Sequence, residues 1–282
     1  MRSSSMRPLA LFIALTTVLS VSAAKDEFQA GDFVKQQLNS IGTDQARAAV
    51  KNRLAQGPVV FQILNGGAEH WEGTEAFVSE GDKFASQLKF PPTVYRTELF
   101  VRDGKKTSIA QVRPGRYTRF GQFVMVHDEI LSEGLWGGTL STGWALAHMD
   151  ERLAKLHDQG LKKVDGRELH QVDYAPKKSS DLEIQLYFEP DTFRHVMTVY
   201  LMTVAAHLGR TQADSKNEQE THYRLEERFA DFKSVDNLTL PARWTIQFTV
   251  GGPASATVDQ YDVTEEKISH NISVDPRNFA IK

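Results

Sequence analysis

The sequence predicts a mainly β protein of the α+β class, built on a single curved antiparallel sheet that forms an unclosed β-barrel. Three observations support this class. Short runs of β-branched and aromatic residues meet at tight turns such as Asp103-Gly104 and Asp165-Gly166. Residues 244–250 alternate apolar and polar side chains, as a strand does when one face is buried. Helical periodicity is confined to the start of the mature chain and to one insert.

A cleavable signal peptide is predicted at residues 1–24. Two arginines precede an uncharged apolar run, and Ser22-Ala23-Ala24 supplies the small residues of a cleavage site. The apolar run is shorter than the ~20 residues needed to span a bilayer. We therefore expect a periplasmic or secreted protein of the cell envelope, with residues 25–282 as a single domain.

Composition narrows the class of protein further. The chain has no cysteine, so it has neither disulfides nor a lipid-modified N-terminal cysteine, and it must rely on its hydrophobic core. The net charge of -3 becomes more negative when the leader is removed, because the leader carries two arginines and no acid. An acidic chain without a basic run has no electrostatic footprint for nucleic acid. We expect a soluble monomer.

Two short helices are expected to open the mature chain. The first spans about residues 33–41 and ends at Gly42. The second begins at Thr43 or Asp44, continues to Leu54 and stops at Gly57-Pro58.

Strands account for most of the remaining chain. Short turns join consecutive strands, which predicts an antiparallel meander, since parallel strands need long crossovers. About ten to eleven strands is near the number at which an open sheet curls. A polar loop is expected at 208–220. The expected strands are 59–64, 71–79, 84–90, 95–101, 107–112, 161–164, 168–174, 184–188, 195–204, 223–232, 244–250 and 256–263.

A helical insert at about 120–156 interrupts this series of strands. Phe123, Val126 and Ile130 lie three and four residues apart, which predicts a helix that ends at Gly134. A further short helix is expected to begin at Ser141 or Thr142. A curled sheet has a concave face, and we expect the helices of the insert to cover it.

Four segments of the chain together resemble a known superfamily. They are a hairpin pattern at 160–177 (Gly-Leu-Lys-Lys-Val-Asp-Gly-Arg-Glu-Leu-His-Gln-Val-Asp-Tyr-Ala-Pro-Lys), a strand pair at 182–196, the step Asp236-Asn-Leu-Thr-Leu-Pro241, and Phe279 near the end. This arrangement resembles the outer-membrane lipoprotein carrier and sorting superfamily (LolA-like). The resemblance implies an unclosed barrel with helices in its mouth, where family members hold acyl chains in transit across the periplasm. Other members carry lipids or act as envelope-stress sensors.

Eight apolar residues form the candidate ligand site, either as a lid or as the wall of a hydrophobic cavity. Methionine and aromatic side chains suit adaptable hydrophobic binding, and Gly134, Gly137, Gly138 and Gly143 would supply hinges for a mobile lid. The other interpretation is ordinary core between insert and sheet, and the sequence leaves both open. The eight residues are Leu135, Trp136, Leu140, Trp144, Leu146, Met149, Phe188 and Met197.

Motifs for catalysis, metals or cofactors are not found. His148 and His157 lack the spacing that places two metal ligands on one helical face. Ser141 lacks the glycine that a nucleophile elbow requires two residues earlier, where Thr139 stands. The sequence therefore predicts a protein without a catalytic residue, a metal site or a cofactor.

The leading functional hypothesis is a periplasmic, non-catalytic carrier that binds a lipid or an acylated protein. The alternative is an envelope adaptor or stress sensor that binds another envelope protein through the same fold, and an enzyme of unknown type is a third. An apolar, roomy interior would favour the carrier, and an exposed apolar patch or open edge strand would favour the adaptor. A polar pocket with a strongly shifted titratable group would favour the enzyme.

Overall fold

The structure is a computed structural model that describes residues 28–94, 96–110, 117–205, 220–252 and 255–281. The expected signal peptide, at residues 1–24, lies outside the described residues, as does nearly all of the polar loop expected at 208–220.

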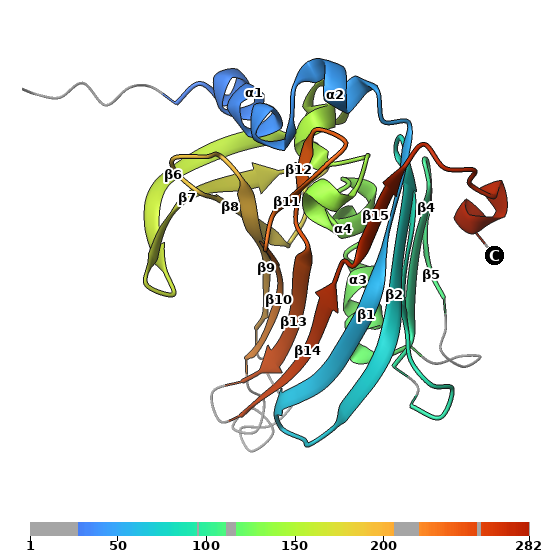
Figure 1. Cartoon of the computed structure of the whole chain (residues 1–282). Helices are drawn as coiled ribbons and strands as arrows, with labels where there is room; N and C mark the ends of the chain where they lie inside the picture. The colour runs from blue at the N-terminus through green and yellow to red at the C-terminus, as the bar shows by residue number, and fades with distance from the viewer. Residues whose placement is uncertain (1–27, 95, 111–116, 206–219, 253–254, 282) are drawn as a thin grey trace, which may run out of the picture.

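One curved antiparallel sheet dominates the molecule (Figure 1). It has 13 strands in the described residues, in the order β5-β4-β3-β2-β1-β14-β13-β10-β9-β8-β7-β6, and β15 also pairs with β1. The first strand therefore pairs with β14 in the middle of the sheet, which leaves β5 and β6 at its two edges. The predicted mainly β fold with an unclosed sheet is confirmed.

The strands follow the expected series, except that β6 begins at Lys155, six residues before the expected strand 161–164, and β11 and β12 form a separate hairpin. Their bounds are β1 Asn52–Asn65, β2 His70–Glu80, β3 Lys83–Lys89, β4 Glu98–Asp103, β5 Thr107–Ile109, β6 Lys155–Val164, β7 Arg167–Ala175, β8 Glu183–Phe188, β9 His195–Val204, β10 Thr221–Ala230, β11 Lys233–Val235, β12 Leu238–Leu240, β13 Arg243–Gly251, β14 Ala256–Thr264 and β15 Lys267–His270.

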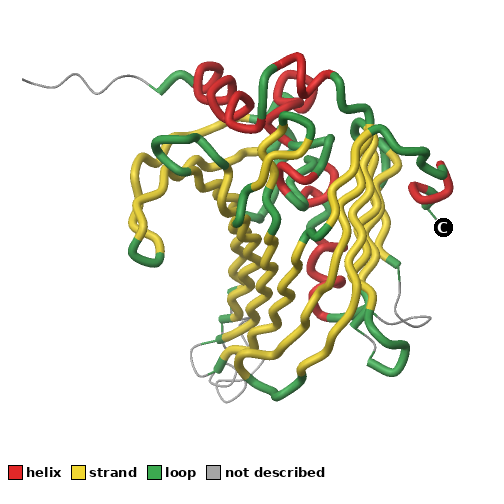
Figure 2. The backbone as a smooth tube through the Cα atoms, viewed as in Figure 1, coloured by secondary structure: helices red, strands yellow, loops and turns green. Residues whose placement is uncertain are grey.

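The helices cover the hollow of the sheet, as Figure 2 shows. The chain leaves β5 at one edge, crosses the hollow and enters β6 at the other edge, so the insert links the two edges from within. Helices α1 and α2 lie over one end of the hollow, and η3 lies outside the sheet against β3 and β4 (Figure 1). The helix bounds are α1 Ala30–Ile41, α2 Asp44–Ala48, α3 Arg119–Val126, α4 Glu129–Ser132, η1 Gly138–Leu140, η2 Ala145–His148, α5 Met149–Arg152 and η3 Pro276–Phe279.

Strand β13 shows how the pattern of side chains builds the core. Trp244, Ile246 and Phe248 are buried on the concave face, whereas Thr245 and Gln247 are half-buried on the convex face. The predicted register of this strand is confirmed. The concave face carries the main hydrophobic core, which joins both halves of the sheet to the insert.

The second helix is shorter than expected, because α2 ends at Ala48 and β1 begins at Asn52. Gly57-Pro58 lies inside β1 and does not end a helix. The reason is a change of partner: β1 pairs with β15 up to Gln56 and with β14 from Val59. Proline has no N–H to leave unpaired there. A Cβ at Gly57 would lie 1.9 Å from the carbonyl oxygen of Thr264, so only glycine fits.

The helix expected to run through Ile130 is broken in two. His127 takes a non-helical conformation, so α3 ends at Val126 and α4 begins at Glu129. The last helix of the insert ends at Arg152, which is earlier than the expected boundary. Strands β11, β12 and β15 were not expected, since they have only three or four residues each and show no long alternation.

Candidate functional site

The concave face is covered unevenly along strands β9, β10 and β13. Tyr200, Leu225 and Phe248 form one cross-strand row, and each is at most 2% exposed. The next row on the same face, two residues along each strand, consists of Met202, Tyr223 and Val250, whose side chains are only half-buried. The covering of the hollow therefore becomes incomplete between these two rows.

A cavity of about 380 Å³ lies over this second row, beneath α3. We call it the α3 groove. On the helix side, the ring of Phe123 stacks on Tyr223 with their centroids 5.8 Å apart. Val126 also faces the groove and is 64% exposed. The groove is lined by Arg119, Gln122, Phe123, Val126, His127, Met202, Val204, Tyr223 and Val250.

The first turn of α3 holds this helix in place. The side chain of Thr118 caps the helix by accepting a hydrogen bond from the N–H of Gly121 at 2.8 Å. The Thr118 hydroxyl in turn donates to the buried carboxyl of Glu98. Burial raises the pKa of Glu98 to about 8, although the Thr118 hydrogen bond and the charge of Arg96 oppose that rise. The helix is thus fixed at its N-terminal end, and residues from both of its halves line the α3 groove beneath it.

A second cavity of about 340 Å³ adjoins the groove, and the two share Val126, His127 and Met202. Its remaining lining is largely polar and includes Glu129, Ser180 and Lys178. Burial acts to raise the pKa of Glu129, but hydrogen bonds with His127 and Ser180 outweigh it and hold the pKa below the usual value. The combined space is apolar over the sheet and polar at its outer end.

The structure places the eight residues of the predicted ligand site on both faces of the sheet. Six of them lie in the concave-face core, each at most 1% exposed, and Met149 packs half-buried against that core. Met197 lies in a separate cluster with Leu169, Tyr187 and Val199, so it does not meet the others. None of the eight lines the α3 groove. The six are Leu135, Trp136, Leu140, Trp144, Leu146 and Phe188.

Buried polar groups of the sheet fix this part of the insert, residues 135–146, which we call the tied segment. Glu227 on β10 accepts hydrogen bonds from the N–H of Gly137 at 2.8 Å and from the indole N–H of Trp244 at 3.0 Å. The hydroxyl of Tyr200 donates to its other oxygen at 2.8 Å. Burial raises the pKa of Glu227 to about 8 despite these three donors. The carboxyl therefore anchors the glycine link to the sheet.

Two further ties hold the tied segment from other elements. The guanidinium of Arg53 on β1 donates to the carbonyl oxygens of Thr139 at 2.6 Å and Leu140 at 3.0 Å. Burial lowers the pKa of Arg53 to about 10. The indole N–H of Trp144 donates to Gln37 on α1 at 3.1 Å. The side chains of Arg53 and Gln37 thus hold the tied segment against β1 and α1.

The described part of the chain also buries the carboxyl groups of Glu75 and Glu265, and burial raises the pKa of both, that of Glu265 to about 7. It contains no cluster of three or more histidine, aspartate or glutamate side chains placed to hold a metal ion. The buried imidazole of His195 stacks on Trp144, with centroids 4.6 Å apart, and burial lowers its pKa to about 3. Such an imidazole stays neutral and packs as part of the core.

The α3 groove was not predicted from the sequence, although one signal for it exists. Residues 123–126 read Phe-Val-Met-Val, so four apolar side chains in succession must point to more than one side of the helix. Met125 is accordingly 42% exposed and is not part of the groove lining. No helix among the described residues has both the length and the apolar character needed to cross a membrane.

Comparisons with known proteins find similarity in three-dimensional structure only. No family model and no curated protein matches the chain. One similar solved structure is described as an outer membrane lipoprotein-sorting protein domain from Vibrio parahaemolyticus, with 9% identity, a TM-score of 0.46, and coverage of 89% of this chain and 97% of that one. Another is a LolA superfamily protein from Nitrosomonas europaea, with 11% identity, a TM-score of 0.49, and coverage of 90% and 99%. The MucA/MucB complex from Pseudomonas aeruginosa matches with 9% identity, a TM-score of 0.24, and coverage of 86% and 99%.

Proposed function

We propose that this protein is a non-catalytic carrier of the periplasm that binds a hydrophobic ligand, an acyl chain of a lipid or of an acylated protein, in the α3 groove. The observation that carries the proposal is the half-buried row Met202, Tyr223 and Val250, which lies under a helix with exposed apolar side chains. An apolar row that the protein itself leaves partly uncovered is a surface that a ligand can bury.

The size and character of the groove fit one alkyl chain. A volume of about 380 Å³ falls within the range of roughly 300–1,000 Å³ that is usual for small-ligand pockets. Each methylene group that leaves water contributes ~0.8 kcal/mol, so a single chain binds usefully without any specific polar contact. The adjoining cavity, whose lining includes Glu129 and Ser180, would then meet an uncharged polar part of the ligand's head group.

Export is part of the same proposal. The signal-peptide pattern at residues 1–24 implies that the mature chain begins at Ala24 or Lys25 and works outside the cytoplasm. N-terminal sequencing of the protein from the envelope fraction tests this. A chain that still begins at Met1 would contradict it.

Two adjacent substitutions on β13 test the binding site. Val250 faces the groove, whereas Thr249 is half-buried on the opposite, convex face. Val250→Asp places a charge against the bound alkyl chain and should weaken fluorescent fatty-acid binding at least about tenfold, a loss of ~1.4 kcal/mol. Thr249→Asp is the matched control and should bind like the wild type. Equal affinity in both variants, or no binding by the wild type, would overturn the proposal.

One observation favours the adaptor as the second candidate. Strand β6 has only β7 as a neighbour among the described residues, and Leu161 on it is 57% exposed. An open edge strand can pair with a strand of another protein. If the wild type binds no fatty acid but crosslinks to an envelope protein through β6, and Leu161→Asp abolishes that crosslink, the adaptor replaces the carrier.

A further inference from the structure

The convex face of the sheet differs between its two halves. On β13 and β14 it is polar, as expected for a face in water: Gln247 donates to Gln260 at 3.1 Å, and Thr245 donates to Asp262 at 2.9 Å. On β1 to β4 the same face carries an apolar patch, which needs a cover. Its apolar side chains are Leu54, Ala76, Val78, Ala85, Leu99 and Val101.

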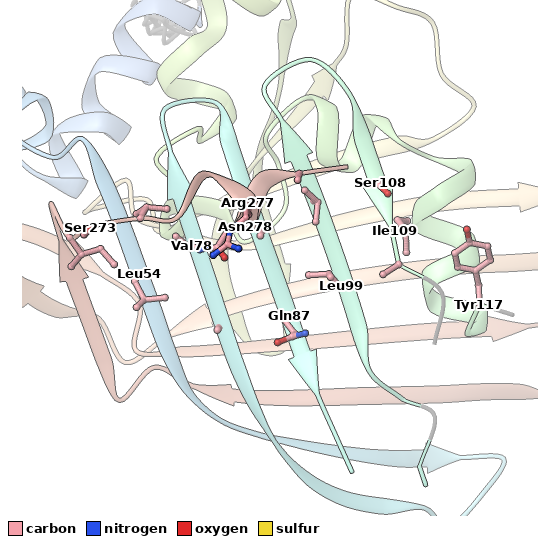
Figure 3. Close-up of a pocket in the computed structure, with 17 residues that line it drawn as sticks. Leu54, Val78, Gln87, Leu99, Ser108, Ile109, Tyr117, Ser273, Arg277 and Asn278 are labelled. Atoms are coloured by element: carbon pink, nitrogen blue, oxygen red, sulfur yellow. The ribbon is translucent and has the colours of Figure 1, made fainter. Parts of the chain in front are cut away.

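The C-terminal segment, residues 272–281, covers only part of this face (Figure 3). Its first residue is held firmly, because Ile272 exchanges two hydrogen bonds with the Asn52 side chain, at 2.9 and 3.0 Å. Farther along, Phe279 is 5% exposed and packs against Val78, Ala85 and Val101. The backbone hydrogen bonds of η3 are local, within the segment itself. One aromatic side chain is thus the main anchor of the segment beyond Ile272.

A space of about 830 Å³ remains between the C-terminal segment and the strands. Small side chains on the floor, such as Ala76 and Ala85, leave it unfilled. Gln87 and Ser108 place polar groups in its wall. The space reaches β5, which has only β4 as a strand neighbour in the described structure. We call this space the convex groove.

We propose that the convex groove is a docking site for an extended segment of a partner protein, whose aromatic side chain replaces Phe279. The C-terminal segment then acts as an internal competitor that the partner displaces. The strand face beside the convex groove already binds a peptide, because Val274, Phe279 and Ile281 of the C-terminal segment pack in one cluster with its apolar side chains. A partner segment with similar apolar side chains could pack on the same face. The edge of β5 offers backbone hydrogen bonds, which a peptide uses and an alkyl chain does not.

A peptide supplied in trans tests this proposal. The probe is a fluorescein-labelled peptide of residues 273–281 (Ser-Val-Asp-Pro-Arg-Asn-Phe-Ala-Ile), added to the full mature chain and followed by anisotropy. In the wild type the tethered segment competes at an effective concentration in the millimolar range, so binding should be weak. Phe279→Ala in the full chain removes the internal anchor and should raise the affinity about tenfold. A probe with alanine in place of its phenylalanine should bind neither chain.

Two further variants make the outcome decisive. Phe279→Leu disturbs packing less and should give an intermediate affinity, which keeps the test valid if Phe279→Ala unfolds the chain. Adding Ala76→Trp to either variant fills the groove floor and should abolish probe binding while fatty-acid binding at the α3 groove persists. If the probe binds the wild type and both Phe279 variants with equal affinity, this proposal is wrong. That result would leave the proposed carrier function unaffected. A concentration-dependent dimer of the variants that excludes the probe would also overturn the docking proposal, in favour of a second copy as occupant.

Discussion

The tied segment and α3 cover the same concave face, yet they differ in how the protein holds them. Buried polar groups on β10, β1 and α1 fix the tied segment, and its large apolar side chains are at most 1% exposed. Helix α3 is anchored at its first turn and leaves Met125 and Val126 exposed. Both segments are rich in apolar residues. The difference lies in where the polar contacts act: they hold the tied segment along its length, whereas they hold α3 only at its first turn.

Trp136→Ala tests the tied segment and should have the largest effect. Its ring is fully buried and lies 4.9 Å from Trp244 and 5.0 Å from Phe100, measured between centroids. Removing it should lower the free energy of unfolding by ~3–5 kcal/mol. Fatty-acid affinity should stay unchanged wherever the variant is folded. The lid hypothesis drawn from the sequence expects the reverse.

Urea unfolding run beside fatty-acid titration separates these two outcomes. Gln247→Ala, on the convex face of β13, is the control and should change stability by less than ~0.5 kcal/mol. If Trp136→Ala weakens ligand binding and leaves the unfolding midpoint in place, the tied segment is a lid, and the contrast with α3 fails.

Glu227→Gln tests the tie to Gly137 through the pH dependence of stability. Burial raises the pKa of Glu227 from 4.5 to about 8, so between these values the folded chain keeps a proton that the unfolded chain has released. The stability contributed by the protonated group is therefore complete below pH 4.5 and is lost as the pH rises toward 8. The loss is at most ~1.4 kcal/mol per pH unit.

The variant cannot ionise, so its stability should fall less between pH 5 and pH 8 than that of the wild type, by on the order of 1–3 kcal/mol. Urea unfolding midpoints at several pH values measure the difference. Burial raises the pKa of Glu98 to about 8 as well, so the stability of the variant should still fall to some extent as the pH rises. Parallel pH profiles for variant and wild type would mean that Glu227 is ionised in the folded protein.

The sequence predicted those parts of the fold that depend on local patterns. The alternation in β13 and the Asp103-Gly104 turn are set by residues close in the chain, and both were predicted correctly. The role of Gly57-Pro58 depends on Thr264, some two hundred residues away, and no local pattern contains it. The α3 groove could not be predicted from the sequence for a similar reason. Tyr200 and Met202 both face the hollow, and only the three-dimensional path of the insert decides which one is covered.

Val126→Gln should have the smallest effect on stability, and it tests whether a ligand lies beneath the C-terminal part of α3. Val126 lines the groove but is 64% exposed, so the free energy of unfolding should change by less than ~0.5 kcal/mol. A bound alkyl chain would lose apolar contact worth ~1 kcal/mol, which lowers fatty-acid affinity roughly fivefold.

Met125→Gln is the matched control, because Met125 lies on the same helix, is 42% exposed and does not line the groove. Because neither substitution disturbs the core, a difference in affinity between them must come from the side of α3 that faces the sheet. Equal affinities would show that the ligand does not pass beneath the C-terminal half of α3.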